Sequence, residues 1–207
     1  MNKVIGHLKT VLTHKRYVAK FCFMCGLYFQ GIFHDMSKFS PTEFFESVKY
    51  WSGTRSPIDA CKEVNGVSEC WLHHRGRNKH HWEYWADNFE SGIMGQKMPF
   101  KYALEMVCDF LGAGVAYNKG FDYFSMEGEY DWWQAKRQVV KMHPETKAFV
   151  DVLFTRFVIV GKDGIKDILG DKEYMTSLKR LYNHGEYCNI FDEYDNVKEE
   201  YDLKYVA

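Results

Sequence analysis

The stretch Phe33-His34-Asp35-Met36-Ser37-Lys38 sets an imidazole directly beside a carboxylate. Adjacent His34 and Asp35 side chains can reach one metal ion, or bridge two, from a single turn of helix. An imidazole nitrogen and a carboxylate oxygen together suit Mn, Fe, Co, Ni or Zn. The pair therefore indicates a metal-dependent enzyme, in which one or two divalent transition metals are completed by ligands from elsewhere in the chain.

Two further candidate ligands lie far from this pair in the sequence. His14 falls on the apolar face of its predicted helix, where a ligand inside a helical bundle would point. Asp109 lies at the edge of a mostly apolar predicted helix. Each residue also has an explanation without a metal, His14 as a hydrogen-bonded core histidine and Asp109 as a solvated carboxylate.

A cluster of histidines supplies the remaining candidates, because four of the nine histidines lie between positions 73 and 81. Neighbouring side chains on a helix diverge by about 100°. One member of each doublet is therefore expected to be a ligand. We favour His74 and His81 as metal ligands, with His73 and His80 as alternates.

Basic residues near these histidines are candidates for binding substrate. Arg75, Arg77 and Lys79 lie between the two doublets, and an arginine can hold a phosphate through two parallel hydrogen bonds. A solvated turn is the alternative for all three. Lys38 lies three residues after Asp35, so on a helical turn it returns to nearly the same face. Asp35 and Lys38 are the expected catalytic residues, although Lys38 also fits a surface position.

The apolar pattern is helical almost throughout, and we find no convincing alternating strand series. It predicts an all-α protein in which residues 1–115 form a metal-binding helical core and residues 116–207 a helical extension packed on it, as one compact domain. Ser40 is expected to cap a helix, with Glu43 closing a capping box. Asn78 is expected to cap another. Helices are predicted over residues 7–29, 41–51, 57–65, 78–90, 99–111, 130–141, 144–160, 171–183 and 186–205.

Composition limits the classes of partner. The 27 Lys+Arg and 28 Asp+Glu residues nearly cancel, so no global field favours nucleic acid or an anionic membrane. No apolar stretch reaches the ~20 residues that span a bilayer. The N-terminus lacks the apolar core and cleavage site of a signal peptide. We therefore expect a cytoplasmic protein with a small phosphorylated substrate and without a membrane or nucleic-acid partner.

His14, the His34-Asp35-Met36-Ser37-Lys38 run, the doubled histidines and Asp109 together resemble the HD-domain superfamily of metal-dependent phosphohydrolases, over roughly residues 7–115. The combined His-Asp-Met-Ser-Lys-Phe and Asn-Lys-His-His-Trp patterns look most like an uncharacterised bacterial and phage branch. The resemblance implies an HD-domain-like helical bundle. It also implies that Asp35 bridges two metals or binds one, that His14, His34 and Asp109 complete the core set, and that two histidines of the 73–81 cluster hold a second ion.

By this resemblance, the expected function is hydrolysis of a nucleotide or small phosphoester by a metal-activated water. Ser37 stands where the cyclic-dinucleotide branch has glycine, and its His-His-Glu and Gly-Tyr-Pro motifs are missing, so cleavage of cyclic dinucleotides is not expected. Two alternatives remain open: an HD-type di-iron oxygenase and a non-catalytic, metal-stabilised helical binding module. The extension after residue 115 either caps the pocket or forms a homodimer contact.

Overall fold

The computed structural model describes residues 2–118, 124–161, 163–183 and 189–206. Over these residues the chain is 74% helical, with 11 α-helices and a small two-stranded sheet, which confirms the prediction of a mainly α-helical protein. None of the described helices combines the length and the apolar character needed to cross a membrane.

The elements follow one another along the chain with short connections. The α-helices are α1 (Lys3–Met24), α2 (Tyr28–Phe33), α3 (Pro41–Tyr50), α4 (Pro57–Asn65), α5 (Glu69–Arg75), α6 (Phe100–Tyr117), α7 (Met126–Arg137), α8 (Pro144–Val160), α9 (Gly164–Gly170), α10 (Lys172–Asn183) and α11 (Ile190–Tyr205). Two 3-10 helices, η1 (Met36–Phe39) and η2 (Trp82–Trp85), and the hairpin strands β1 (Ala86–Phe89) and β2 (Gly92–Gly95) complete the described structure.

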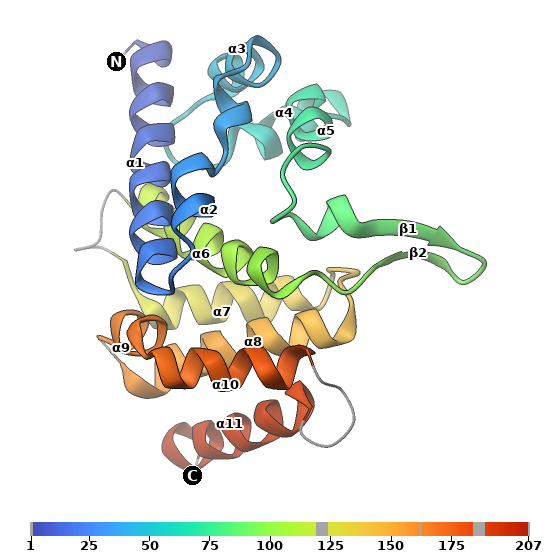
Figure 1. Ribbon diagram of the computed structural model, residues 1–207. Helices are drawn as coiled ribbons and strands as arrows, with labels where there is room; N and C mark the ends of the chain where they lie inside the picture. Colours follow the sequence, from blue (N-terminus) through green and yellow to red (C-terminus); the bar gives the residue numbers. More distant parts are fainter. Residues whose placement is uncertain (1, 119–123, 162, 184–188, 207) are drawn as a thin grey trace.

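The helices form two groups that meet along α6 (Figure 1). Helices α1 to α5 make up the first group, in which α1 packs against α2 and α6, and α3 packs against α4 and α5. Helices α7 to α11 make up the second, gathered around α8, most of whose residues are buried. The second group reaches back to α1 through α9 and to α6 through α8 and α10. The helices after residue 115 thus pack on those before it.

A close contact between α1 and α6 sets the distance between two candidate ligands. A Cβ added at Gly112 of α6 would lie 2.4 Å from Cγ2 of Val18 and 3.1 Å from its backbone nitrogen. The helix predicted over residues 99–111 does not end before Gly112, because α6 continues to Tyr117. The missing side chain instead lets the two helices approach each other, with His14 on one and Asp109 on the other.

The predicted helix over residues 7–29 is two helices. Helix α1 ends at Met24, and Gly26 takes the left-handed conformation (φ 78°) that turns the chain into α2. His34 follows α2 as its C-terminal cap, and Asp35 has a positive φ of 54°, alone among the described non-glycine residues. The His34-Asp35 pair therefore lies in a bend between α2 and η1. The prediction that both side chains act from a single turn of helix is therefore wrong.

The predicted helix over residues 78–90 is also wrong. Asn78 caps no helix, and the chain forms η2 and then a hairpin in which Phe89 pairs with Gly92. Gly92, with a φ of 107°, supplies the tight turn. The hairpin projects from the helical body (Figure 1).

The remaining helices follow the predictions more closely. Helices α4 and α8 have the predicted limits, whereas α7 begins and ends four residues earlier than predicted. Helix α9 was not predicted. Ser40 caps α3 as expected by accepting a hydrogen bond from the Glu43 backbone, but the Glu43 side chain does not close a capping box. Its carboxylate points instead to the histidines described next.

Candidate metal centre

Four buried side chains from three parts of the chain converge on one point. They are His14 of α1, His34 and Asp35 of the bend after α2, and Asp109 of α6. The Nε2 atom of His14 lies 3.1 Å from Oδ1 of Asp109, 3.3 Å from Oδ2 of Asp35 and 3.3 Å from Nε2 of His34. Nε2 of His34 lies 3.3 Å from each carboxylate. We refer to this cluster as the first metal position.

These spacings fit a bound transition metal. Ligands about 2.0–2.2 Å from an ion are roughly 2.8–3.6 Å apart in octahedral or tetrahedral geometry. The measured separations of 3.1–3.3 Å fall inside that range. Two imidazoles and two carboxylates are also a donor set that Mn, Fe, Co, Ni and Zn accept. The cluster could therefore hold one such ion.

A second cluster lies on the other side of Asp35. Oδ1 of Asp35 is 3.3 Å from Nε2 of His74 and 3.3 Å from Nε2 of His80, and His81 belongs to the same group. In the part of the chain that is described, Asp35 Oδ1, His80 Nε2 and His81 Nε2 are fully buried without hydrogen-bond partners. Buried polar atoms are rarely left so. Three such atoms in one place point to a missing ligand, and we refer to this cluster as the second metal position.

Asp35 belongs to both positions, with Oδ2 facing the first and Oδ1 the second. Its left-handed backbone conformation is uncommon for a residue other than glycine, asparagine or aspartate, and such strain is concentrated at functional sites. One carboxylate with each oxygen in a different cluster is the arrangement of a bridging ligand. The geometry could therefore hold two ions that share Asp35.

Two buried carboxylates fix the orientation of the imidazoles from behind. Oε1 of Glu105 accepts from Nδ1 of His34 (3.0 Å) and from Nδ1 of His80 (3.2 Å). Oε2 of Glu43 accepts from Nδ1 of His74 (2.7 Å). These contacts keep a hydrogen on each Nδ1, so that an ion that displaces the proton of Nε2 would meet a lone pair facing the cluster. Metal-binding histidines are commonly held this way.

Lys38 is the lysine paired with Asp35. Its Nζ lies 2.6 Å from Oδ2 of Asp35, as the three-residue spacing predicts. Burial tends to lower the pKa of Lys38, but Asp35 and Asp109 outweigh burial and raise it. Burial would likewise raise the pKa of Asp35, yet His34 and Lys38 hold it well below its usual range. Both groups are therefore charged at neutral pH.

The doublets divide differently from the prediction that one histidine of each is a ligand. In the first doublet, His74 faces the second metal position, while Nδ1 of His73 bonds Oε1 of Glu43 (2.6 Å). In the second doublet, both His80 and His81 face the second metal position. The bend after α5 makes this convergence possible, because residues 80 and 81 precede η2 and do not lie on a helix.

The predicted substrate-binding residues lie outside the metal clusters. Arg77 and Lys79 line a small cavity of about 240 Å³, which the candidate ligands His34, Asp35 and His80 and the carboxylate of Glu105 also border. Arg75 lines neither this cavity nor the larger one described below. Arg77 and Lys79 therefore border candidate metal ligands, but from a different cavity than the larger one.

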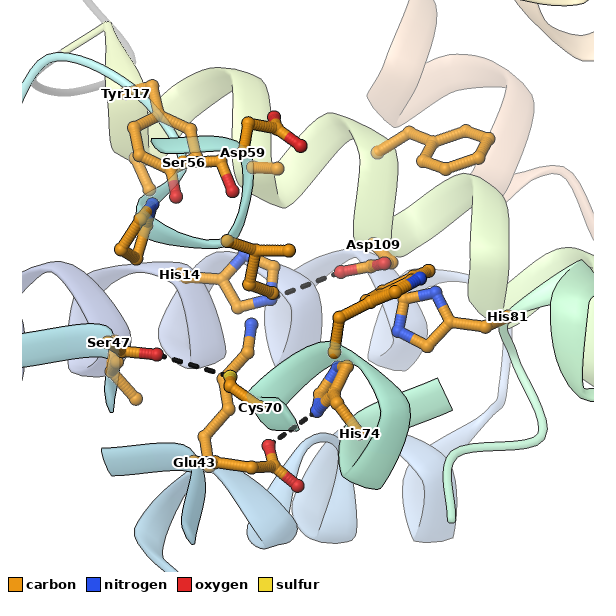
Figure 2. A pocket seen from close by; sticks show the side chains of 18 of the residues that line it. His14, Glu43, Ser47, Ser56, Asp59, Cys70, His74, His81, Asp109 and Tyr117 are labelled. Carbon is orange, nitrogen blue, oxygen red and sulfur yellow. Dashed lines mark hydrogen bonds and ion pairs between the residues drawn. The ribbon is translucent and has the colours of Figure 1, made fainter. Parts of the chain in front are cut away.

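A larger cavity of about 310 Å³ opens beside both metal positions. It is bounded by the ligands His14, His74, His81 and Asp109, together with Lys38. Figure 2 shows these four ligands around the same space, with Ser56, Asp59 and Tyr117 across from them. Its further walls are mostly apolar and aromatic: Val11, Pro57, Ile58, Trp71, Trp82, Met106, Phe110, Trp132 and Val140. A small molecule can therefore reach both the ligands and the lysine.

Sequence reasoning did not identify Glu43, Glu105, Ser37 or Asn78. Asn78 donates to the Ser37 hydroxyl (2.8 Å) and to the His74 carbonyl (2.8 Å), which ties η1 to α5. Glu105 had one available signal, since it lies four residues before Asp109 and so on the same helical face. The contacts of Glu43 with the histidines and of Asn78 with Ser37 join residues 30 or more positions apart and leave no local pattern.

Comparison with known proteins gives one match. A family described as "Family of unknown function (DUF5662)" matches residues 3–156, which include every residue of both metal positions. No curated protein and no solved structure matches the chain significantly. The chain belongs to the DUF5662 family.

Proposed function

We propose that this DUF5662 member is a metal-dependent phosphohydrolase that acts on a nucleotide or small phosphoester. The observation that carries the proposal is Asp35, whose two carboxylate oxygens face separate ligand clusters 3.3 Å from imidazole nitrogens on each side. Paired divalent ions are a common device for hydrolysing phosphate esters. The resemblance to HD-domain phosphohydrolases favours the same activity.

The ligand set favours two transition-metal ions, chosen among Mn, Fe, Co, Ni and Zn. His14, His34 and Asp109 would hold one ion together with Asp35. The second would be held by Asp35 and the imidazoles of His74, His80 and His81. Such ions polarise a phosphoryl oxygen and lower the pKa of a water molecule to near neutrality.

The chain's own groups then have distinct tasks. Glu43 and Glu105 hold the imidazoles in the tautomer that presents Nε2. Lys38, charged and lining the larger cavity, stabilises negative charge that develops on the phosphoryl group. Apolar walls limit the water around this charge, which strengthens its interaction with the lysine. The cavity volume of about 310 Å³ suits one small substrate molecule.

An iron pair that activates dioxygen is the second candidate, because the same histidine-rich ligands also suit iron. The oxygenase would consume dioxygen, whereas the phosphohydrolase would consume water. Iron retained on purification, with oxygen uptake and without hydrolysis, would select the oxygenase. Hydrolysis supported by redox-inert Zn²⁺, or by Mn²⁺ without oxygen uptake, would select the phosphohydrolase.

The test is a metal-dependent activity screen. Metal-free protein is supplied with Mn²⁺ or Co²⁺ and assayed against nucleotides and generic phosphoesters, beside Asp35→Ala and the control Asp87→Ala. Asp87 is an exposed carboxylate of the projecting hairpin. We expect hydrolysis that requires metal, is lost in Asp35→Ala and is unchanged in Asp87→Ala. Hydrolysis that survives Asp35→Ala would contradict the proposal.

A further inference from the structure

The larger cavity extends well beyond the metal ligands. Besides Lys38 and the ligands, it reaches His7 and Thr10 of α1 and Ser47 of α3. His7 precedes His14 by seven residues on the same helix, a separation of about 10 Å at ~1.5 Å rise per residue. A phosphate bound at the ligands would therefore leave the region around His7 to the rest of the substrate.

His7 is a buried side chain whose ring packs on Phe44 and whose Nδ1 atom lacks a hydrogen-bond partner among the described residues. Only 5% of the residue is exposed, and its Nδ1 atom is fully buried. Its polar neighbours in the cavity wall are satisfied. The Thr10 hydroxyl donates to the Gly6 carbonyl (3.1 Å) and accepts from the Trp51 indole (3.2 Å), and the Ser47 hydroxyl lies 3.3 Å from the Cys70 sulfur.

The metal positions do not explain this imidazole. The other unpartnered buried atoms that border the site, on Asp35, His80 and His81, all belong to the second metal position. His7 belongs to neither cluster. Since buried polar groups are nearly always hydrogen-bonded, an unpartnered imidazole on a cavity wall is suited to a ligand in that cavity.

The chemistry of the site limits the kind of group that His7 can bind. Burial, and to a smaller extent Lys38, lowers the pKa of His7 to about 4, so the imidazole is neutral at pH 7. A neutral imidazole offers one donor and one acceptor and no countercharge. It suits a hydroxyl or another uncharged hydrogen-bonding group better than a second anion.

We propose that His7 is a specificity-determining residue that hydrogen-bonds an uncharged polar group, such as a hydroxyl, at the end of the substrate remote from its phosphate. The inference rests on the proposed function, because the metal positions define where the phosphate lies. It narrows the substrate to a phosphoester whose alcohol part is long enough to reach His7 and ends in a polar group.

Non-hydrolysable phosphonates test this directly. Mn²⁺-loaded protein is titrated calorimetrically with unbranched alkylphosphonates of increasing length, each with and without a terminal hydroxyl. At the chain length that reaches His7, the hydroxyl is expected to tighten binding by about 3- to 10-fold, as one neutral hydrogen bond allows. The ratio of the two dissociation constants, for the phosphonate without the hydroxyl over the phosphonate with it, should fall to about one in His7→Phe. It should be partly retained in His7→Gln.

Ser47→Ala is the matched control, because Ser47 lines the same cavity and its hydroxyl already contacts Cys70. The ratio should be unchanged in this variant. Binding of the phosphonate without a hydroxyl reports, for every variant, that the fold and the metal positions are intact. Any of three results would overturn the inference. The ratio could be near one at all lengths in the unmodified protein, the phosphonates could fail to bind at all, or His7→Phe could leave the ratio unchanged.

The result separates this inference from the proposed function. Phosphonates are bound and not cleaved, so a hydroxyl preference that depends on His7 supports the inference even if no ester is hydrolysed. Hydrolysis of phosphoesters without any hydroxyl preference would leave the proposed function standing and remove the role of His7.

Discussion

Replacing Glu105 with glutamine removes one negative charge behind two metal ligands at once. One oxygen, Oε1, accepts hydrogen bonds from Nδ1 of His34 at 3.0 Å and from Nδ1 of His80 at 3.2 Å. Nε2 of His34 belongs to the first metal position and Nε2 of His80 to the second. Glutamine keeps the size and one acceptor oxygen, but it no longer makes the imidazoles more electron-rich.

The expected loss follows from the number of ligands affected. Removing a group that supports a metal ligand typically lowers affinity by about 10- to 100-fold. Glu105→Gln should therefore weaken both ions by about this factor. Glu43→Gln should weaken only the ion at the second position, because Glu43 supports His74 and no ligand of the first position.

Titration of the metal-free protein with Zn²⁺ against a coloured chelator measures the two affinities, and elemental analysis gives the number of ions per chain. Relative to the unmodified protein, Glu43→Gln should have one weakened metal site. Glu105→Gln should have two. Two sites of unchanged affinity in Glu105→Gln, or the same single loss in both variants, would refute the reasoning.

Three further predictions concern single residues. Lys38→Met should lower kcat for phosphoester hydrolysis by about 100- to 1000-fold, as expected when one charge-stabilising donor is lost. The metal content should be unchanged. An unchanged kcat would contradict the role of Lys38. Gly112→Ala should lower the free energy of unfolding by about 1–3 kcal/mol, because the added methyl group overlaps Val18. Urea denaturation measures this change. A neutral effect would show that α1 and α6 can separate freely. Burial raises the pKa of Glu129 from 4.5 to about 7, so the folded protein retains a proton that the unfolded chain releases and stability falls as the pH rises through this interval. Glu129→Gln should therefore stabilise the protein by up to about 3 kcal/mol at pH 8 and little at pH 4, and equal thermal shifts at both pH values would exclude this explanation.

Helical periodicity predicts which parts of this chain are buried, and short motifs predict where several helices begin. Prolines at the first positions of α3, α4 and α8 mark helix starts without reference to the rest of the fold. The hairpin at 86–95 has no alternating apolar pattern, since its strands read Ala-Asp-Asn-Phe and Gly-Ile-Met-Gly, so local sequence does not distinguish it from the end of a helix. Tertiary contacts decide between the two, including the bond from the Gly95 backbone to the Lys141 carbonyl.

The candidate ligands illustrate the same limit. His14, His34, Asp35 and Asp109 are recognisable as candidates from the adjacent His34-Asp35 pair and from the mostly apolar helices that carry His14 and Asp109. Their distances are not recognisable, because these depend on the close approach of α1 to α6 at Gly112. Glu43 shows the opposite case, since its sequence context favours a local capping role, whereas two histidines 30 and 31 residues away take its carboxylate.

The central claim is that Asp35 bridges two metal ions. Anomalous X-ray diffraction from crystals of the protein loaded with Mn²⁺ tests it most directly. The account predicts two anomalous peaks roughly 3.5–4 Å apart, one beside each carboxylate oxygen of Asp35. A single peak remote from Asp35, or none at saturating Mn²⁺ and likewise none with Zn²⁺, would contradict it.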